Sequence, residues 1–226
     1  MGESELTLAV VIPTLNEAGH IEDAIESARS AKANEIIVVD GGSTDETVAI
    51  AMATNARVIK CDRPGRGCQL ALGADGSNSE LLLFLHADNQ LPQSFRKQYL
   101  DAGKPTWGGL NQQISAKGLR YRALEAGNAW RVQLTGRVFG DQAIFVRRKR
   151  YRQIGGFASI PLMEDVELSR RLNSFERPVL LPGPLNVSAR RWKARGICRQ
   201  TWLNWRLQWA YARGASPQTL AQRYRG

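Results

Sequence analysis

The chain has 226 residues and a formal net charge of +10, and 43% of its residues are hydrophobic. This length supports one sizeable core or two small ones, and the composition is that of an ordinary globular protein. No apolar run reaches the roughly 18 residues that a membrane-spanning helix needs. The acidic start, Met1 to Glu5, argues against a signal peptide. Cys61, Cys68 and Cys198 lack disulfide or metal spacing, so we expect a reduced, cytoplasmic chain.

The first part of the chain alternates predicted strands with predicted helices. Short apolar segments predict buried strands at residues 6–12, 35–39, 56–60 and 81–85. Helices are predicted over residues 21–28, over a segment capped by Ser43 or Thr44 that opens with Asp45 and Glu46, and over residues 68–74. This alternation predicts a doubly wound parallel sheet over residues 6–90, with helices on both faces.

The second part of the chain is a mixture of elements. Helices are predicted at residues 92–102, 119–134, 148–154, 163–172 and 197–211 and from 217, and strands at 108–114, 143–147, 179–181 and 185–188. There is no internal repeat and no long linker. We therefore expect one domain over residues 1–226, with a nucleotide-binding half (1–105), an acceptor half (106–192) and a basic, aromatic helical tail (193–226).

Polar side chains follow three of the predicted parallel strands. Asn16 and Glu17 come after the first strand, Asp40 after the second, and His86 and Asp88 after the fourth. Open α/β sheets bind ligands at the carboxyl ends of their strands. Positions i and i+2 of a strand point to one side, so His86 and Asp88 are expected to project together. Such a group of residues suits a ribose, a base and a divalent metal bound to phosphate.

Three of the candidate residues also have simpler interpretations. Asp40 can cap the Gly41-Gly42 turn, Glu17 can lie in a first helical turn, and Arg66 can be a solvated loop charge. The chain contains neither G-x-G-x-x-G in its first loop nor G-x-x-x-x-G-K-[ST] anywhere, so dinucleotide-dehydrogenase and P-loop interpretations lose their main support.

Seven separated motifs resemble those of one enzyme family. In chain order they are VVIPTLNE, IIVVDGGSTDET, GRGCQLALGA, LLFLHADN, GDQAIFVRR, MEDVELSRRL and SARRW. Together they resemble the family 2 glycosyltransferases of the GT-A type, and most of all the short bacterial branch described as radical-SAM/selenodomain-associated transferases. The resemblance covers residues 7 to 192. It implies a Rossmann-like, mostly parallel sheet and an enzyme that moves a sugar from a nucleotide-sugar donor to an acceptor hydroxyl.

The resemblance also implies roles for individual residues. The nucleotide-binding set is Pro13, Thr14, Asn16, Glu17, Asp40, Arg66 and His86. The D-x-D motif of the family appears as His86-Ala87-Asp88, so Asp88 keeps the metal role for Mn²⁺ or Mg²⁺, and His86 contacts either the ribose or the metal. Asp165 is the implied general base of a single, inverting displacement. Asp141, Glu164, Arg191 and Trp192 are implied to line the acceptor side.

Two departures from the family pattern affect these implications. The first Asp of D-x-D is replaced by His86, and the Gln of Q-x-x-R-W is missing before Arg191-Trp192, which argues against a processive polymerase. Two other classes remain as alternatives. A sugar-nucleotide pyrophosphorylase would need a glycine-rich first loop, and a non-catalytic binding protein would be supported by His86 alone.

All of the excess positive charge lies in the last part of the chain. From Arg177 onward there are ten basic residues and no acidic one, and Trp202, Trp205 and Trp209 lie at helical spacing there. This pattern predicts an amphipathic helix. The helix could dock its Trp face on the core, bind an anionic membrane surface at the inner face of the membrane, or bind nucleic acid, which no accompanying motif supports.

Overall fold

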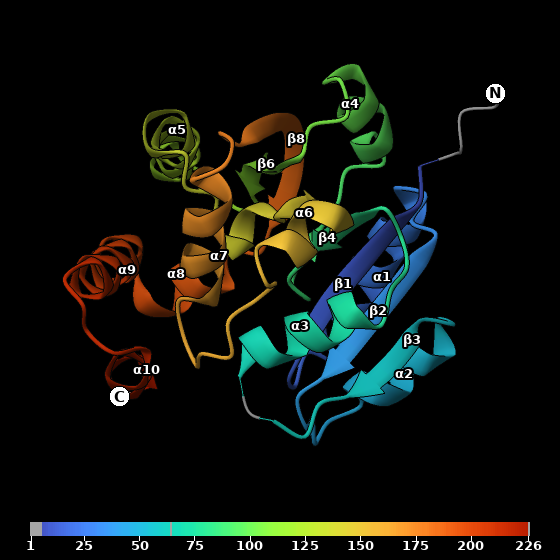
Figure 1. The fold of residues 1–226 in the computed structure, drawn as a ribbon. Coiled ribbons are helices and arrows are strands. Elements are labelled where there is room, and N and C mark those ends of the chain that lie inside the picture. Colours follow the sequence, from blue (N-terminus) through green and yellow to red (C-terminus); the bar gives the residue numbers. More distant parts are fainter. Residues whose placement is uncertain (1–5, 64, 226) are drawn as a thin grey trace.

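The computed structural model of the chain describes residues 6–63 and 65–225. Residues 1–5, on which the argument against a signal peptide depends, lie outside this part. One eight-stranded sheet crosses the molecule in the order β3-β2-β1-β4-β7-β6-β8-β5, with helices on both faces (Figure 1). The sheet therefore continues from the amino-terminal half of the chain into the carboxyl-terminal half.

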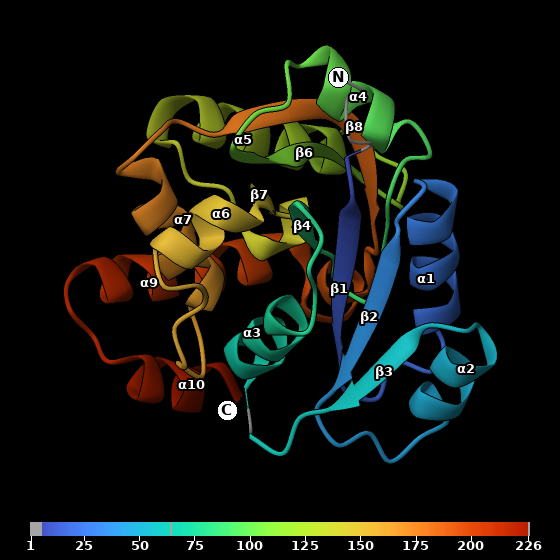
Figure 2. The same ribbon diagram turned by 45° about the vertical axis from the view of Figure 1, so that its right-hand side comes forward.

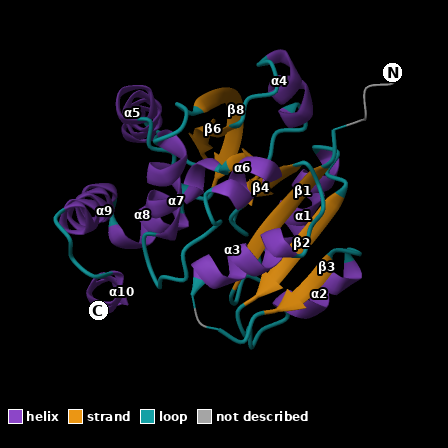
Figure 3. Cartoon of the chain, in the orientation of Figure 1, coloured by secondary structure: helices purple, strands orange, loops and turns teal. Residues whose placement is uncertain are grey.

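The amino-terminal half is the predicted parallel unit. The strands are β1 (Leu8–Thr14), β2 (Glu35–Asp40), β3 (Arg57–Lys60) and β4 (Leu81–Phe84), all parallel to their neighbours among the four. The helices α1 (Ile21–Ser30), α2 (Thr47–Ala53) and α3 (Arg66–Asp75) connect them. The arrowheads of β1, β2 and β3 point toward one edge of the molecule (Figure 3). The prediction for residues 6–90 is confirmed.

Alternate side chains of β1 enter two apolar cores. Val10 packs with α1 and α4 on one face of the sheet, and Val11 packs with α3 and α7 on the other. A Cβ on Gly73 of α3 would lie 2.3 Å from Cγ1 of Val11, so a larger residue would push the helix away from the strand. Because both faces are covered by apolar side chains, the polar residues of this half gather in loops at the strand ends.

The carboxyl-terminal half of the sheet is mixed, as predicted. β7 (Phe145–Arg147) is antiparallel to β4 and to β6 (Trp107–Ile114), β8 (Val179–Val187) is parallel to β6, and β5 (Asn89–Gln90) is antiparallel to β8. The two short strands predicted at 179–181 and 185–188 are one strand. A register shift opposite Leu110 and Gln112 accommodates the prolines at its middle.

The helices of this half confirm the predicted ones to within a few residues. They are α4 (Phe95–Asp101), α5 (Leu119–Thr135), α6 (Arg148–Gln153) and α7 (Glu164–Asn173). A single 3₁₀ turn, η1 (Gly140–Gln142), stands between α5 and β7. The two-residue strand β5 was not predicted, because two residues carry no periodicity.

The tail forms three helices, of which α8 (Arg190–Arg195) was not predicted and α9 (Ile197–Ala212) and α10 (Pro217–Arg225) were. Both ribbon views place α9 and α10 on the side of the molecule opposite α1 and α2 (Figure 2). Leu207 and Leu220 are buried against Met163 in a small third core. Within residues 6–63 and 65–225, no helix has the length and apolarity to cross a membrane.

The three Trp residues of α9 do not pack on the core. The side chains of Trp202, Trp205 and Trp209 are 60%, 73% and 53% exposed. The hypothesis that α9 docks through its Trp face is therefore wrong. The helix docks through Leu207, which lies on its other side.

Candidate active site

The loops that follow β1 and β2 are bonded to each other. The Asn16 side-chain oxygen accepts a hydrogen bond from the Thr44 N–H at 2.8 Å, and the Asn16 N–H donates to the Ser43 hydroxyl at 2.9 Å. These bonds occupy the two residues expected to cap α2. That expectation is wrong, since α2 begins at Thr47, whose N–H donates to Asp45 at 3.0 Å.

Asp40 shapes the turn after β2. Its carboxylate accepts hydrogen bonds from the N–H groups of Gly42 at 2.9 Å and Ser43 at 3.1 Å. The turn-capping interpretation of Asp40 therefore holds, and it does not exclude ligand binding, because carboxylate oxygens have further lone pairs. The adjoining backbone is fixed by Gln69, whose amide donates to the carbonyl oxygens of Thr14 and Val39 at 2.8 Å each.

His86 and Asp88 lie in the turn after β4, not on the strand itself. β4 ends at Phe84, so the expected strand alternation does not reach them. Both side chains nevertheless line one small cavity of about 60 Å³. The Asp88 carboxylate is 2.9 Å from Nε of Arg190, and a second donor of Arg190 bonds to Glu17. Glu17 precedes α1 and is thus not part of a first helical turn.

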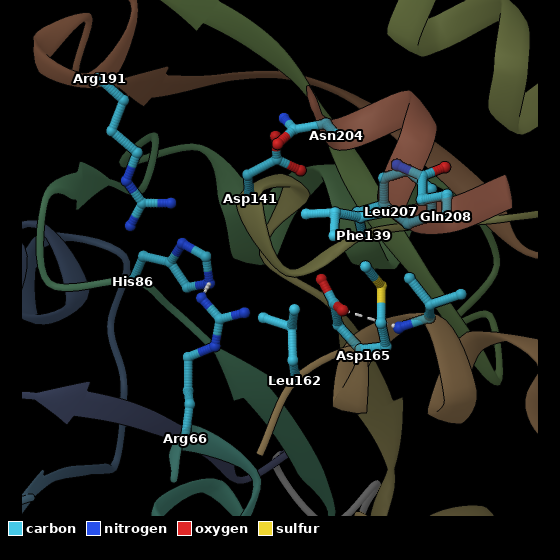
Figure 4. A pocket seen from close by; sticks show the side chains of 12 residues that line it. Arg66, His86, Phe139, Asp141, Leu162, Asp165, Arg191, Asn204, Leu207 and Gln208 are labelled. Carbon is cyan, nitrogen blue, oxygen red and sulfur yellow. Dashed lines mark hydrogen bonds between the residues drawn. The ribbon is translucent and has the colours of Figure 1, made fainter. Parts of the chain in front are cut away.

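A second cavity, of about 130 Å³, adjoins the first (Figure 4). His86, Asp141, Arg191 and Asn204 line both cavities. The other residues that line the larger one are Arg66, Phe139, Leu162, Met163, Asp165, Val166, Leu207 and Gln208. Trp192 lines only the smaller cavity. Residues from η1, α3, α7, α8 and α9 thus meet His86 at one place, beside the carboxyl end of β4.

Asp165 and His86 both lie close to Gly140. The Gly140 N–H donates to Oδ2 of Asp165 at 2.8 Å, and the Val166 N–H donates to Oδ1 at 2.8 Å. A Cβ on Gly140 would lie 2.9 Å from Nε2 of His86 and 3.1 Å from Oδ2 of Asp165. Glycine at this position lets the two functional groups approach each other. In Figure 4 both point into the cavity.

His86 is a neutral imidazole in this environment. Burial holds its pKa well below the usual value of 6.5, and the positive charges of Arg66, Arg191 and Arg190 lower the pKa further. Its Nε2 lies 3.4 Å from Nη1 of Arg66. A neutral ring nitrogen can accept a hydrogen bond or coordinate a metal, which an imidazolium cannot do.

Asp141 lies deeper in the same group of residues. Burial raises the pKa of its carboxyl group, while Arg131 opposes the rise. Its Oδ1 is buried without a hydrogen-bond partner, and its backbone carbonyl accepts from the Gln112 side chain at 2.8 Å. An unpartnered buried acceptor that lines both cavities is suited to receive a hydrogen bond from a bound ligand.

Arg66 and Glu164 form an ion pair beneath the larger cavity. Nε of Arg66 donates to Oε1 of Glu164, which is only 1% exposed. Burial raises the pKa of Glu164, and the charge of Arg66 counteracts this. Arg66 is therefore not a solvated loop charge. Glu164 lines neither cavity and instead pairs with Arg66, so its acceptor-side role stays a prediction.

The sequence patterns did not identify four residues that contribute to this site. Arg190 precedes the expected Arg191-Trp192 pair, and Gln69 lies inside the GRGCQLALGA segment. Asn204 and Gln208 lie one turn apart on α9, where the Trp and Arg residues dominate the pattern. Asn204 and Gln208 meet the rest of the site through residues far away in the sequence, so no local signal indicates them, whereas Arg190 and Gln69 stand within the quoted motifs without an assigned role.

The fold and the site together define a class. The sheet is mostly parallel with a mixed second half, which is the arrangement of a GT-A type fold. Acids, arginines and a neutral histidine lie beside the carboxyl ends of its parallel strands. The family model described as Glycosyl transferase family 2 matches residues 9–106. This match covers less than half of the chain, and together with the ordered motifs and the fold it makes the chain similar to the family 2 glycosyltransferases.

Curated relatives are similar over part of their length. Glucosyl-3-phosphoglycerate synthase of Mycobacterium tuberculosis is 34% identical over 93 residues, which cover 36% of this chain and 29% of the relative. Succinoglycan biosynthesis protein ExoA of Rhizobium meliloti is 29% identical over 201 residues, which cover 76% of this chain and 60% of ExoA. The chain thus spans less than a third of the first relative and three fifths of the second.

Solved structures share the fold at low sequence identity. S. aureus TarS, residues 1–349, superposes with a TM-score of 0.64 and 16% identity, covering 81% of this chain and 61% of that one. M. tuberculosis glucosyl-3-phosphoglycerate synthase, in complex with Mn²⁺, UDP and phosphoglyceric acid, gives a TM-score of 0.57 and 20% identity, covering 81% and 68%. The GT-A architecture predicted from the motifs is confirmed.

Proposed function

We propose that this chain transfers a sugar, of the hexosyl type, from a nucleotide-sugar donor to an acceptor hydroxyl, with inversion and with Asp165 as general base. The observation that carries the proposal is the position of the Asp165 carboxylate. Two backbone N–H groups fix its orientation, and it faces a cavity shared with His86 and Arg66. A general base has to be held at the place where the donor ends and the acceptor enters.

The donor nucleotide is assigned to the loops after β1 and β2. The family match covers this part of the chain, residues 9–106, and hydrogen bonds from the Gly42 and Ser43 N–H groups to Asp40 fix the backbone of the loop after β2. Pro13, Thr14, Asn16, Glu17 and Asp40 line this edge in the proposal. Arg66 and His86 lie further along, where the diphosphate and sugar would reach the larger cavity.

The metal ligands that the protein offers, Asp88 and His86, fit a divalent metal that is held chiefly by the diphosphate of the nucleotide. Asp88 supplies one carboxylate and His86 a neutral nitrogen, and Mg²⁺ is commonly held by one or two protein carboxylates together with substrate phosphates. Arg190 competes for Asp88, so the metal and Arg190 would exchange places or share the carboxylate. A bound Mn²⁺ or Mg²⁺ would neutralise negative charge on the leaving diphosphate.

The protein side chains account for the remaining chemistry. Asp165 accepts the proton of the acceptor hydroxyl while that oxygen attacks C1 of the sugar from the face opposite the leaving group. The nearby guanidinium groups of Arg66 and Arg191 offset charge on the departing nucleotide. Asp141 accepts a hydrogen bond from the acceptor. One displacement inverts the anomeric centre, and no covalent intermediate is required.

The test compares Asp165→Asn with Glu167→Gln, a carboxylate on the same helix that pairs with Arg171 away from both cavities. Nucleoside diphosphates and nucleotide sugars are first screened by thermal shift with Mg²⁺ or Mn²⁺, since a ligand of the folded state raises its stability. We expect Asp165→Asn to keep the nucleotide affinity and lose turnover about 10²–10⁴-fold. Glu167→Gln should retain turnover.

A second candidate is a non-catalytic nucleotide-sugar-binding protein. The Asp88–Arg190 ion pair favours it, because the carboxylate that would hold the metal already has a cationic partner. The same experiment separates the two candidates. Nucleotide binding without sugar transfer or donor hydrolysis, with every metal tried, supports the second candidate and contradicts the first.

A further inference from the structure

Helix α9 has two faces with different surroundings. On the inner face, Gln200 and Leu207 are each 3% exposed, and Asn204 and Gln208 line the larger cavity or both cavities. Leu207 packs with Leu220 of α10 and Met163, which fixes the helix on the body of the protein. Helix α9 is therefore fixed on the protein through its inner face, and its outer face is exposed to solvent.

The outward face combines indole rings with guanidinium groups. Trp202, Trp205 and Trp209 are all more than half exposed. Arg206 lies over the ring of Trp202 at 5.1 Å, and Arg213 lies over the ring of Trp209 at 3.6 Å. With 3.6 residues per turn, Arg206 and Arg213 lie less than about 90° around the helix axis from Trp202 and Trp209. Apolar and cationic groups thus share one surface, here called the Trp/Arg face.

We propose that the Trp/Arg face binds the surface of an anionic phospholipid bilayer. Trp is an amphipathic side chain suited to the headgroup level of a membrane, and each Arg is attracted by anionic lipids. The charge of the tail matches this occupant, because no acidic residue follows Glu176 and the whole net charge of +10 lies beyond it. A second copy of the chain fits less well, since it would set one Arg stripe against another.

The proposal has a consequence for the acceptor, and this consequence rests on the proposed function. The inner face of α9 lines the cavity that contains Asp165, so a bilayer bound to the outer face would lie about one helix diameter, roughly 10 Å, from that cavity. An acceptor hydroxyl attached to a lipid could then enter beside α9. The chemical class of acceptor that this geometry favours is a lipid-linked alcohol or sugar.

The experiment measures binding of the full chain to vesicles by co-sedimentation. Vesicles of phosphatidylcholine with phosphatidylglycerol are compared with vesicles of phosphatidylcholine alone, at low and high salt. We expect binding to the anionic vesicles only, weakened by salt because screening shortens the reach of the charges. The double variant Trp209→Ala/Arg213→Gln should bind at least about tenfold more weakly.

A matched control is available elsewhere on the surface. Arg150 lies over the exposed ring of Phe175 at 4.9 Å, so Phe175→Ala/Arg150→Gln removes a similar pair from α6 and the segment after α7. This control should bind vesicles like the wild type. The proposal is overturned if both double variants lose vesicle binding equally, or if the wild type does not bind anionic vesicles at low salt. It is also overturned if the chain forms a dimer and does not bind vesicles.

Nucleotide affinity is measured in parallel to keep the two proposals apart. Trp209 and Arg213 lie outside both cavities, so the double variant should keep the nucleotide affinity of the wild type. Vesicle binding without any nucleotide binding contradicts the proposed function and leaves the membrane proposal supported. Nucleotide binding and turnover without vesicle binding contradict the membrane proposal alone.

Discussion

Arg190 lies 2.9 Å from Asp88, measured from Nε to Oδ2, and so a guanidinium from α8 occupies the carboxylate that the sequence motif assigns to a metal. The two residues are about a hundred positions apart in the chain. Arg190 also bonds to Glu17 of the first loop, which joins the donor edge to the tail. Any divalent ion has to compete with this contact.

We expect Arg190→Gln to strengthen metal binding. With the ion pair removed, Asp88 is free for Mn²⁺, and the gain should be about fivefold in affinity, since a partly exposed pair contributes up to about 1 kcal/mol. Titration calorimetry of Mn²⁺ into the complex with a nucleoside diphosphate measures it. Asp88→Asn is the control and should abolish the metal dependence. A wild type whose nucleotide affinity is the same with and without chelator contradicts the metal assignment.

His86 should make folding sensitive to mild acid. Its pKa is depressed in the folded protein, so the unfolded chain binds a proton more readily below the usual pKa of 6.5. The neutral, buried His86 therefore contributes its full share to the stability of the folded protein above pH 6.5, and this contribution is lost as the pH falls below 6.5. Between pH 7.5 and 5.5 the wild type should lose about 1 kcal/mol more of its free energy of unfolding than His86→Gln. Urea titrations at both pH values measure this, and parallel losses would contradict the buried neutral imidazole.

His86→Asp should retain turnover. A carboxylate at this position restores the D-x-D pattern and would lie among Arg66, Arg190 and Arg191, whose charges compensate its burial. Oxygen ligands suit Mg²⁺ better than imidazole does, so preference should shift from Mn²⁺ toward Mg²⁺. Steady-state rates with each metal provide the measurement. Complete loss of activity with both would show that the imidazole itself is required.

Gly140→Ala should reduce turnover strongly and should change the free energy of unfolding little. The added Cβ would lie 2.9 Å from His86 and 3.1 Å from Asp165, so both side chains have to shift. We expect at least about a tenfold loss of turnover, because misplacing a base by about 1 Å can cost up to about 10². Gly127→Ala on α5 is the matched control. Its added Cβ would meet no atom within 4 Å beyond its chain neighbours and the backbone of its own helix, and the substitution should stabilise the protein by about 0.5–1 kcal/mol. Unchanged rates in Gly140→Ala would show that this spacing is not needed.

The Arg66–Glu164 pair should respond unequally to removal of either partner. Arg66→Met leaves a carboxyl group that is 1% exposed without its cation, whereas Glu164→Gln leaves Arg66, whose side chain is 31% exposed and can be hydrated. Arg66→Met should lower the free energy of unfolding by about 3 kcal/mol, and Glu164→Gln should lower it less. In Arg66→Met the pKa of Glu164 stays raised in the folded state, so stability is greatest at low pH and falls as the pH rises. Chemical unfolding at pH 5 and pH 8 tests the sign.

The donor half was predictable from the sequence because its signals are local. Continuous apolar strands at 6–12 and 81–85, and polar residues directly after them, specify a parallel sheet with ligand-binding loops at one edge. The helix at 197–211 was likewise predictable from the helical spacing of its Trp residues. The motif order also indicated the family whose model matches residues 9–106. Roles that rest on that resemblance, above all those of Asp165 and Asp88, stay predictions.

Other features depend on which distant segments the fold brings together. The strand ends placed Asp40, His86 and Asp88 near a common edge and the family resemblance added Asp165, but only the tertiary structure set Arg190 against Asp88 and Glu164 against Arg66. It also decided which face of α9 is buried, because Leu207 packs with Met163 and Leu220, whereas the three Trp residues stay more than half exposed. Local periodicity shows that a helix has two faces. Which face is covered depends on the shape and chemistry of the surface against which it packs, and that surface is built from residues far away in the chain.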